Sequence, residues 1–389
     1  MSRRGAGRRA SRFARCGLIG LVLLGGAPPP GGLAQAWSVR GDRDALALHH
    51  GRYVLNRAFG DLYDSVFVLT QPDAAAPRAV TVTELANAFL RYDVVFFGEF
   101  HGHPGVHLQQ MKLLRALYER DPKIVLSLEQ FERDTQRVVD DYLAGRIGDR
   151  TLIDKGRAWD NYPTSYRPLL TFARQHDIPV IAAEAPTWAI ACIGQQGADI
   201  LDAFTPEERG WVAKDLHVDE GKYREKFQQF ESGSATHGGG GSSSPEAKLK
   251  SERSFTAQVA RDDTMAESIF VARQKYPGRR ILHLNGAFHS AAFLGLVERL
   301  RLRDPTLKIA VIDPVEVDDP KAPAFAEQQR HDGTALLLLY PSPPEFAEGE
   351  DPSAFIHSIM AKRKANACKY ALPNAGAGTA PPGADHVAP

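Results

Sequence analysis

The chain has 389 residues, of which 43% are hydrophobic and 24% charged, and its 47 basic side chains balance its 47 acidic ones. Six arginines lie in the first 36 residues, which hold no acidic residue, so the remainder carries 41 basic and 47 acidic groups. This excess of negative charge argues against nucleic acid as the main partner. The two cysteines of the remainder, Cys192 and Cys368, are too few for the disulfide framework of a small secreted domain, so an ordinary core must stabilise the protein.

The first 36 residues have the features of a secretory signal peptide. An arginine-rich start precedes an apolar stretch from Gly17 to about Gly25, and an Ala-x-Ala cleavage site ends at Ala36. No lipidation box follows the stretch, since Cys16 precedes it, and no segment has the roughly 20 apolar residues that span a bilayer. We therefore expect a periplasmic or secreted protein with no transmembrane segment.

Apolar runs that alternate with helical patterns predict the fold of the remaining chain. Continuous apolar strands between helices are typical of an α/β protein with a mostly parallel central sheet, flanked by helices on both faces. We expect that fold here, with a helical insertion, in a single domain over residues 37–368. In chain order the runs are DVVFFGEFH, KIVLSLEQF, IPVIAAEAP, RRILHLNGAFH, KIAVIDP and TALLLLYP.

Helix-start signals accompany these runs. Thr81 with Glu84, and Thr205 with Glu208, have capping-box spacing. Residues 231–252 are rich in Gly and Ser without periodicity and predict a mobile loop. The helix after this loop should turn Phe255, Val259, Ala266, Ile269 and Phe270 largely toward the sheet. Residues 369–389, rich in Pro, Gly and Ala, predict a disordered tail.

Ionisable residues end several of the predicted strands. They are Glu99 with His101, Glu129, Glu184 and His289, with Asp313 and Tyr340 after the later runs. Ligands of open parallel sheets bind beyond the carboxyl ends of the strands, so these groups predict a binding site there. A single glutamate at a strand end is more often a cap or a salt-bridge partner, whereas four such ends in one chain favour a site.

Two Gly-x-x-His motifs strengthen this prediction. Gly98 to His101 and Gly286 to His289 end two apolar strands, and a glycine lets the backbone turn sharply toward a ligand. His103 and His107 begin a helix four residues apart, and His107 is the better candidate ligand of the two. His283 lies inside a strand and is expected in the core.

A second cluster lies in RAWDNYPTSYRPLLTFARQ. Trp159, Tyr162 and Tyr166 alternate there with Arg157 and Arg167. Aromatic faces beside guanidinium groups suit a flat anionic ligand such as a porphyrin with its propionates. The alternative is a loop packed by its own aromatic side chains.

Five segments in this order resemble the ChaN-like haem-binding uptake family of the Tiki and erythromycin-esterase superfamily. They are VVFFGEFHGHPGVH, SLEQFERDTQRVVDDYLAG, WDNYPTSYRPLLTFARQHDIPVIAAEAP, FTAQVARDDTMAESI and NGAFHSAAFLGLVERL. The resemblance covers roughly residues 81–313. It implies a periplasmic or surface protein of iron acquisition that binds haem, as a homodimer around stacked haems with a tyrosine on the iron.

The resemblance places the haem contacts of this chain in one segment and one helix. Tyr166 is the first choice of iron ligand and Tyr162 the second, with Trp159, Arg167 and His107 as further haem-binding residues. In the wider superfamily, hydrolytic members use the Gly-x-x-His pair and strand-end glutamates.

Two other classes of function stay open. A metal-dependent hydrolase, of esterase or peptidase type, would hold a divalent transition metal with His101, His289, Glu99 and Glu184, and would use Glu99 or Glu129 as general base. A binding or scaffold protein whose ancestral site has decayed is the third hypothesis.

Overall fold

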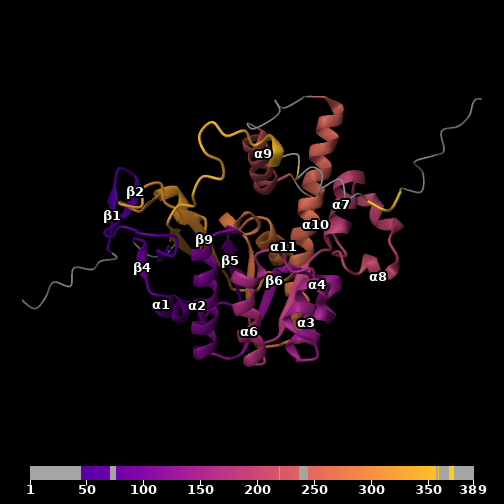
Figure 1. Ribbon diagram of the computed structural model, residues 1–389, viewed down its shortest axis with the longest axis horizontal. Helices are drawn as coiled ribbons and strands as arrows, with labels where there is room; N and C mark the ends of the chain where they lie inside the picture. Colours follow the sequence, from indigo (N-terminus) through magenta and orange to yellow (C-terminus); the bar gives the residue numbers. More distant parts are fainter. Residues whose placement is uncertain are drawn as a thin grey trace, which may run out of the picture. The chain divides into compact units, whose positions relative to one another are not determined.

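A mostly parallel sheet forms the centre of this protein. Its computed structural model describes residues 45–70, 76–218, 220–235, 244–355, 358 and 368–371. Within these residues, eight strands have the order β4-β3-β11-β9-β5-β8-β6-β7 (Figure 1). β3 is antiparallel to β4 and β11, and all other neighbours are parallel. The strands are β3 (Ser65–Leu69), β4 (Arg78–Val80), β5 (Val94–Glu99), β6 (Ile124–Glu132), β7 (Val180–Glu184), β8 (Arg280–Gly286), β9 (Ile309–Glu316) and β11 (Ala335–Leu339).

All six predicted apolar runs are strands of this sheet. Every residue of β5 and of β8 is buried, because helices cover both faces of the sheet and leave neither side for polar residues. The α/β fold with a mostly parallel sheet is therefore confirmed.

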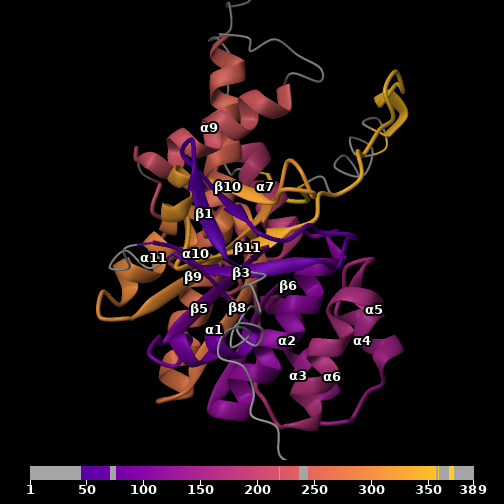
Figure 2. The ribbon, with the colours of Figure 1, turned by 90° about the vertical axis from the view of Figure 1, so that its left-hand side faces the viewer.

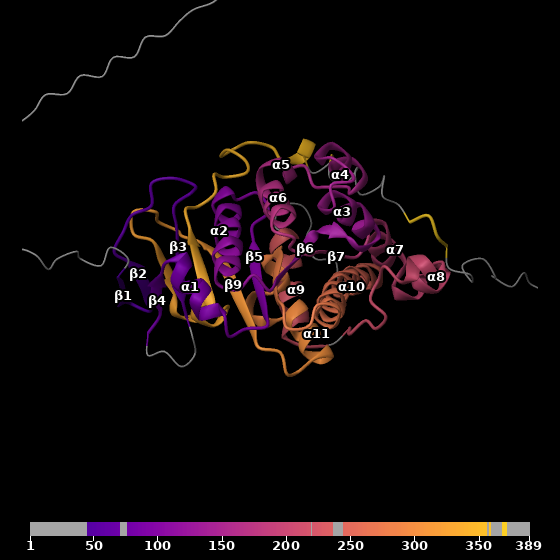
Figure 3. The same ribbon diagram turned by 90° about the horizontal axis from the view of Figure 1, so that it is seen from below.

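Helices cover the sheet on both faces, as Figure 3 shows. Leu113 of α2 packs in one core with Phe97 of β5, whereas Ile269 of α10 packs in another with Phe96. Helices of the first face are α1 (Val82–Phe89), α2 (Pro104–Arg120), α3 (Gln136–Leu143), α4 (Asp149–Lys155), α5 (Tyr162–Ser165) and α6 (Arg167–Gln175); those of the second are α10 (Pro245–Lys275) and α11 (Leu296–Arg303).

Two capping boxes occur where the sequence predicts them. Thr81 starts α1 and Thr205 starts α8 (Pro206–Arg209), each bonded reciprocally to the glutamate three residues later. In α10, Phe255, Val259, Ala266 and Ile269 are buried and Phe270 is partly buried. Ala266 and Ile269 pack against the sheet as predicted, whereas Phe255 and Val259 pack instead against Tyr223 and Phe227 of the helix Lys222–Ala235.

The Gly/Ser loop predicted over residues 231–252 is shorter than expected. α9 (Lys222–Ala235) continues into its start, and α10 begins at Pro245 because the Ser244 side chain accepts a hydrogen bond from the Ala247 N–H. α9 packs against the N-terminal half of α10 (Figure 2) through Tyr223 and Phe255. The residues between the two helices, 236–243, lie outside the described part of the chain.

A small antiparallel sheet, β1-β2-β10, was not expected from the sequence. β1 (Leu46–His49) and β2 (Arg52–Leu55) pair through a two-residue turn at His50 and Gly51, whose φ angles are both positive (47° and 76°). β10 (Ala324–Ala326) joins the other edge of β2. The three strands are short, and most residues of β1 are exposed. The sequence therefore lacks the apolar run by which the strands of the central sheet were predicted.

The predicted signal peptide over residues 1–36 lies outside the described residues, as does the predicted tail beyond residue 371. Within the described ranges, no helix has both the length and the apolar character that crossing a membrane requires.

A disulfide joins Cys192 of α7 (Thr187–Gln196) to Cys368, 176 residues further along the chain. The ring of Tyr370 packs 5.0 Å from that of Phe204, and its hydroxyl donates to Glu208. Residues 368–371 are thus held against α7 and α8, so the tail predicted to be disordered from residue 369 is ordered as far as residue 371.

Replacing Cys368 with serine is expected to lower the free energy of unfolding by about 2–4 kcal/mol, because the disulfide closes a long loop and restricts the unfolded chain. Urea denaturation of both proteins without reductant measures the difference. The wild type with dithiothreitol serves as the control and should match the variant. Equal stability of oxidised and reduced wild type would contradict the expectation.

Candidate functional site

Five predicted site residues lie together at the carboxyl edge of β5, β8, β6 and β7. The order of these strands explains the arrangement, because the carboxyl ends of neighbouring parallel strands align. Ion pairs form two groups among the residues: Glu99 pairs with His101, and Arg261 joins Glu129 to Glu184 while His289 lies beside Glu129. We call them the carboxyl-edge cluster: Glu99, His101, Glu129, Glu184 and His289.

Glu99 is the most enclosed acid of the cluster, and four donors surround its carboxylate. Gln110 donates to Oε2 at 2.6 Å; the Tyr166 hydroxyl and the Gln130 amide donate to Oε1 at 2.5 and 3.1 Å. His101 Nδ1 lies 2.8 Å from the same oxygen. A carboxylate with no side-chain exposure needs such partners, since an unpaired buried charge is costly.

His101 sits at the mouth of the site. Its side chain is 49% exposed, and its ring packs edge-on against Trp159 with centroids 4.8 Å apart. The ring lies over Gly286, where a Cβ atom would come within 2.9 Å of His101 Cε1 and would displace the ring. Burial lowers the pKa of His101, but the hydrogen bond to Glu99 and the charge of Glu129 outweigh it, and the pKa is raised.

Arg261 lies between the other two glutamates of the cluster. It donates from Nη2 to Glu129 Oε1 at 2.7 Å and from Nε to Glu184 Oε2 at 2.8 Å. Burial raises the pKa of Glu184 despite this partner. For Glu129, the charges of His289, Arg261 and His101 and the Gly286 N–H outweigh burial and lower the pKa to about 2.

This guanidinium corrects the metal prediction. Arg261 supplies the positive charge that a divalent metal between Glu129 and Glu184 would have supplied. Among the described residues, no group of three His, Cys, Asp or Glu side chains has a geometry able to hold a metal ion. His101, His289, Glu99 and Glu184 therefore do not form the expected metal site.

His289 is oriented by an acid that sequence reasoning missed. Its Nδ1 donates to Asp262 Oδ1 at 2.5 Å, and the Tyr223 hydroxyl donates to the other oxygen of Asp262. His289 Nε2 lies 3.7 Å from Glu129 Oε1, and the residue is only 4% exposed. Asp262 and Arg261 are adjacent in ARDD of α10, and this charged run in an otherwise buried helix was the available signal.

Both tyrosines of the predicted haem segment are buried. Tyr166 has no exposure and donates to Glu99, and Tyr162 is 1% exposed and donates to Asp149 at 3.0 Å. Burial raises the pKa of both phenols, and the neighbouring carboxylates raise it further. Arg167 pairs with Asp149 at 2.9 Å. Neither phenol faces solvent in this conformation, because each hydroxyl pairs with a carboxylate from outside the segment.

The histidines of α2 have structural partners. His107 is 6% exposed, with Nε2 on the His101 carbonyl at 3.0 Å and Nδ1 on Gln110 Oε1 at 3.1 Å, so its expected contact with haem stays a prediction that would need these partners to be exchanged. His103 caps α2 by accepting from the Gly105 N–H. His283 is in the core as expected, and burial lowers its pKa to about 3.

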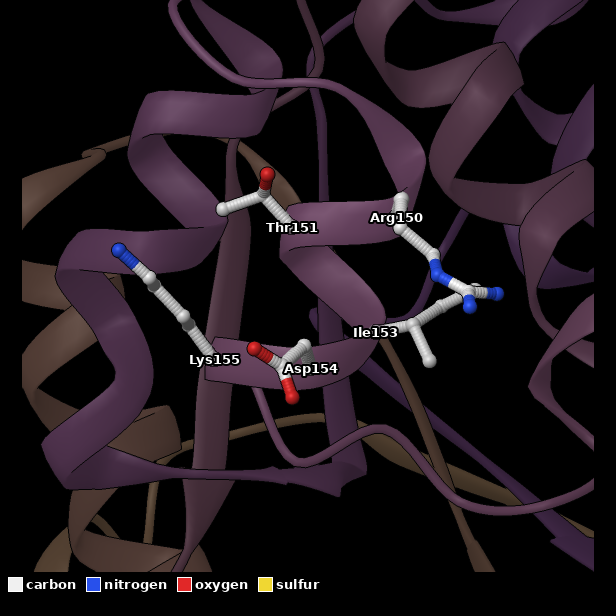
Figure 4. A pocket seen from close by; sticks show the side chains of 5 residues that line it. All are labelled: Arg150, Thr151, Ile153, Asp154 and Lys155. Carbon is white, nitrogen blue, oxygen red and sulfur yellow. The ribbon is translucent and has the colours of Figure 1, made fainter.

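A hollow on the surface of α4 is separate from the carboxyl-edge cluster. Figure 4 shows its side chains, all from this one short helix. None of the predicted site residues lines it. The lining residues are Arg150, Thr151, Ile153, Asp154 and Lys155.

Replacing Arg261 with methionine should lower the free energy of unfolding by about 3–5 kcal/mol at neutral pH, because two buried carboxylates lose their shared cation. The loss should shrink as the pH falls and the carboxylates take up protons. Urea denaturation at several pH values measures it. Arg253→Met in the same helix, whose guanidinium only reaches the Gln195 carbonyl, is the control and should change stability by less than about 0.5 kcal/mol. A small loss that does not depend on pH would contradict the bridging role.

Comparison with solved structures supports the fold. A ChaN protein of Campylobacter jejuni, described by its cofacial haem binding, shares 15% identity; the match covers 72% of this chain and 98% of that one with a TM-score of 0.52. An erythromycin esterase in its open conformation (11% identity, 65% and 77% covered) and a Bacillus cereus protein (12%, 70% and 93%) have TM-scores of 0.37 and 0.38, too low to bear on the site.

Sequence comparison identifies the family. Among curated proteins, no relative was found. Residues 85–300 match the family described as haem-binding uptake, Tiki superfamily, ChaN. The matched range contains the whole carboxyl-edge cluster as well as Arg261 and Asp262. The chain therefore belongs to the ChaN family of the Tiki superfamily.

Proposed function

We propose that this protein binds haem at the carboxyl edge of its sheet and acts in iron acquisition outside the cytoplasm. The observation that carries the proposal is the family match over residues 85–300, which spans every strand that contributes to the carboxyl-edge cluster. Cofacial haem binding by the Campylobacter jejuni protein supports the same ligand.

The side chains at this edge have the chemistry that haem requires. A porphyrin is flat and apolar with a metal at its centre, so it suits aromatic side chains beside an imidazole. Phe100 is 38% exposed beside the half-exposed His101, whose ring contacts the partly buried Trp159. A bound haem would supply the iron, and these residues would hold and orient it.

Ligation of the haem iron by Tyr166 or Tyr162 stays a prediction, and it would require the protein to change conformation. Tyr166 would have to leave Glu99 and Tyr162 would have to leave Asp149, and the segment would have to open to bring either hydroxyl to the surface. Arg167 would likewise exchange Asp149 for a propionate. The expected homodimer also stays a prediction.

A hydrolase is not proposed. Glu129, one of the two expected general bases, is paired with Arg261, which keeps its pKa low, and Glu99 already accepts from four donors. Neither carboxylate is free to take a proton from water without losing a buried partner.

Export is supported by the disulfide between Cys192 and Cys368. Such bonds form and persist in oxidising compartments such as the periplasm and are rare in the cytosol. Together with the predicted signal peptide over residues 1–36, the disulfide favours a periplasmic or secreted protein.

Titration of the purified mature protein with ferric haemin tests the proposal. We expect a saturable shift of the Soret band, and we expect Trp159→Ala to weaken binding because the ring beside His101 is lost. Trp211→Ala is the matched control, because Trp211 packs instead against Trp188, away from the carboxyl-edge cluster. No saturable shift in the wild type, or equal weakening by both variants, would refute the proposal.

A further inference from the structure

The loop that contains His289 has a strained backbone. We call residues 287–295 the His289 loop. Ala292 and Phe293, neither of them glycine, have positive φ angles of 60° and 59°. Such a conformation persists only where surrounding groups hold it. One support is the Ala292 N–H, which donates to the Asp332 carbonyl at 2.8 Å. The loop therefore depends on contacts with other elements of the fold.

Lys226 of α9 binds the same loop through its side chain. Its Nζ donates to the Phe288 carbonyl at 2.9 Å and to the Ala291 carbonyl at 3.1 Å. It also lies over the Phe288 ring, 4.8 Å from the centroid. A charged donor makes stronger hydrogen bonds than a neutral one, and an ammonium group is attracted to an aromatic face. One side chain of α9 thus holds the carbonyls on both sides of His289.

The Lys226 ammonium lies in a largely acidic environment. Burial lowers the pKa of Lys226, although the charges of four acids oppose this. Burial also raises the pKa of Asp313 to about 8, so this acid is largely uncharged at neutral pH and leaves the two carbonyls as the direct partners of Lys226. The four acids are Asp313 of β9, Asp262 of α10, Glu298 of α11 and Asp332, which precedes β11.

Tyr223 gives α9 a second contact with the His289 loop. A Cβ atom at Gly295 would come within 2.8 Å of the Tyr223 ring, so the ring packs directly on the loop. The Tyr223 hydroxyl donates to Asp262, the acid that orients His289. The apolar contacts of α9 belong to a small cluster that is separate from the cores of the sheet. Elements with few buried apolar contacts open most easily.

The partly buried ring of Phe288 lies against α9. Phe288 follows Gly286 of the second Gly-x-x-His motif by two residues, so its ring adjoins the carboxyl edge of β8. Three aromatic rings of α9 contact it. They are those of Tyr223, Phe227 and Phe230, at centroid distances of 5.7, 6.4 and 5.2 Å.

We infer that α9 is a cover over the His289 loop and that Lys226 is the positioning residue that holds it closed. Loss of the contacts between Lys226 and the loop would let α9 move away from the Phe288 ring and would free the strained backbone beside His289. Opening of α9 would thereby expose an apolar face at the second Gly-x-x-His motif. The inference concerns the protein without haem and goes beyond the proposed function.

Amide hydrogen exchange of the mature protein without haem, followed by mass spectrometry of its peptides, tests the inference. Lys226→Met should speed exchange in the His289 loop and in α9 by about 10- to 100-fold, because hydrogen bonds from a charged donor are lost. Exchange in α2, which packs on the other face of the sheet, should not change. Lys222→Met, at an exposed lysine of the same helix, is the matched control and should behave as the wild type.

Chemical rescue separates the role of the ammonium group from the packing of its aliphatic stem. Lys226→Ala removes the side chain beyond Cβ, a group equivalent to propylammonium, and should speed exchange in the same loop. Propylammonium chloride should slow this exchange again, whereas the same concentration of sodium chloride should not.

Three results would overturn the inference. The first is exchange that neither Lys226 variant changes. The second is equal acceleration in α2 and in the His289 loop, which would mean that Lys226 only contributes to overall stability. If neither variant folds, the wild type decides, because a cover must exchange faster than the buried strands β5 and β8, and equal protection would be the third. None of these results bears on haem binding, so the proposed function would stand.

Discussion

The site depends on the burial of the Glu99 carboxylate. An ionised acid with no exposed side-chain surface is stable only where charged or polar donors replace the water it has lost, and here the donors come from three parts of the chain. Gln110 comes from α2, Gln130 from β6 and Tyr166 from the end of α5. Satisfying Glu99 therefore fixes how these elements meet at the sheet edge. The same carboxylate orients His101 and holds the Tyr166 hydroxyl away from solvent.

The two Gly-x-x-His motifs have different roles despite their matching sequence. His289 lies below the surface between Asp262 and Glu129, and Arg261 compensates the charge of Glu129 from the opposite side. The carboxylates around His289 are therefore neutralised by cations of the protein itself and need no external cation. His101 lies above Gly286 with half of its side chain exposed. Of the two motif histidines, only His101 is therefore exposed to solvent to a substantial degree.

Local patterns in the sequence were sufficient to predict six of the eight described strands of the central sheet, but not β3 and β4. The apolar runs identified six strands because burial on both faces leaves no polar alternation, and the parallel order brought Glu99, Glu129 and His289 to one edge. The role of Arg261 could not be predicted, because it comes from a helix on one face and its partners are set by packing. The hydrogen bond from Tyr166 to Glu99 could not be predicted for a related reason, because the two residues are 67 positions apart in the sequence and meet only through packing.

The proposed haem site lies where Trp159 packs edge-on against the half-exposed ring of His101. Ligation by Tyr166 or Tyr162 would need the segment from Trp159 to Tyr166 to open, because both hydroxyls are paired with carboxylates. A crystal structure of the mature protein with ferric haemin tests the account most directly. The account predicts haem at the carboxyl edge of the sheet, in contact with Trp159. Haem bound elsewhere on the molecule, away from Trp159 and His101, would contradict it.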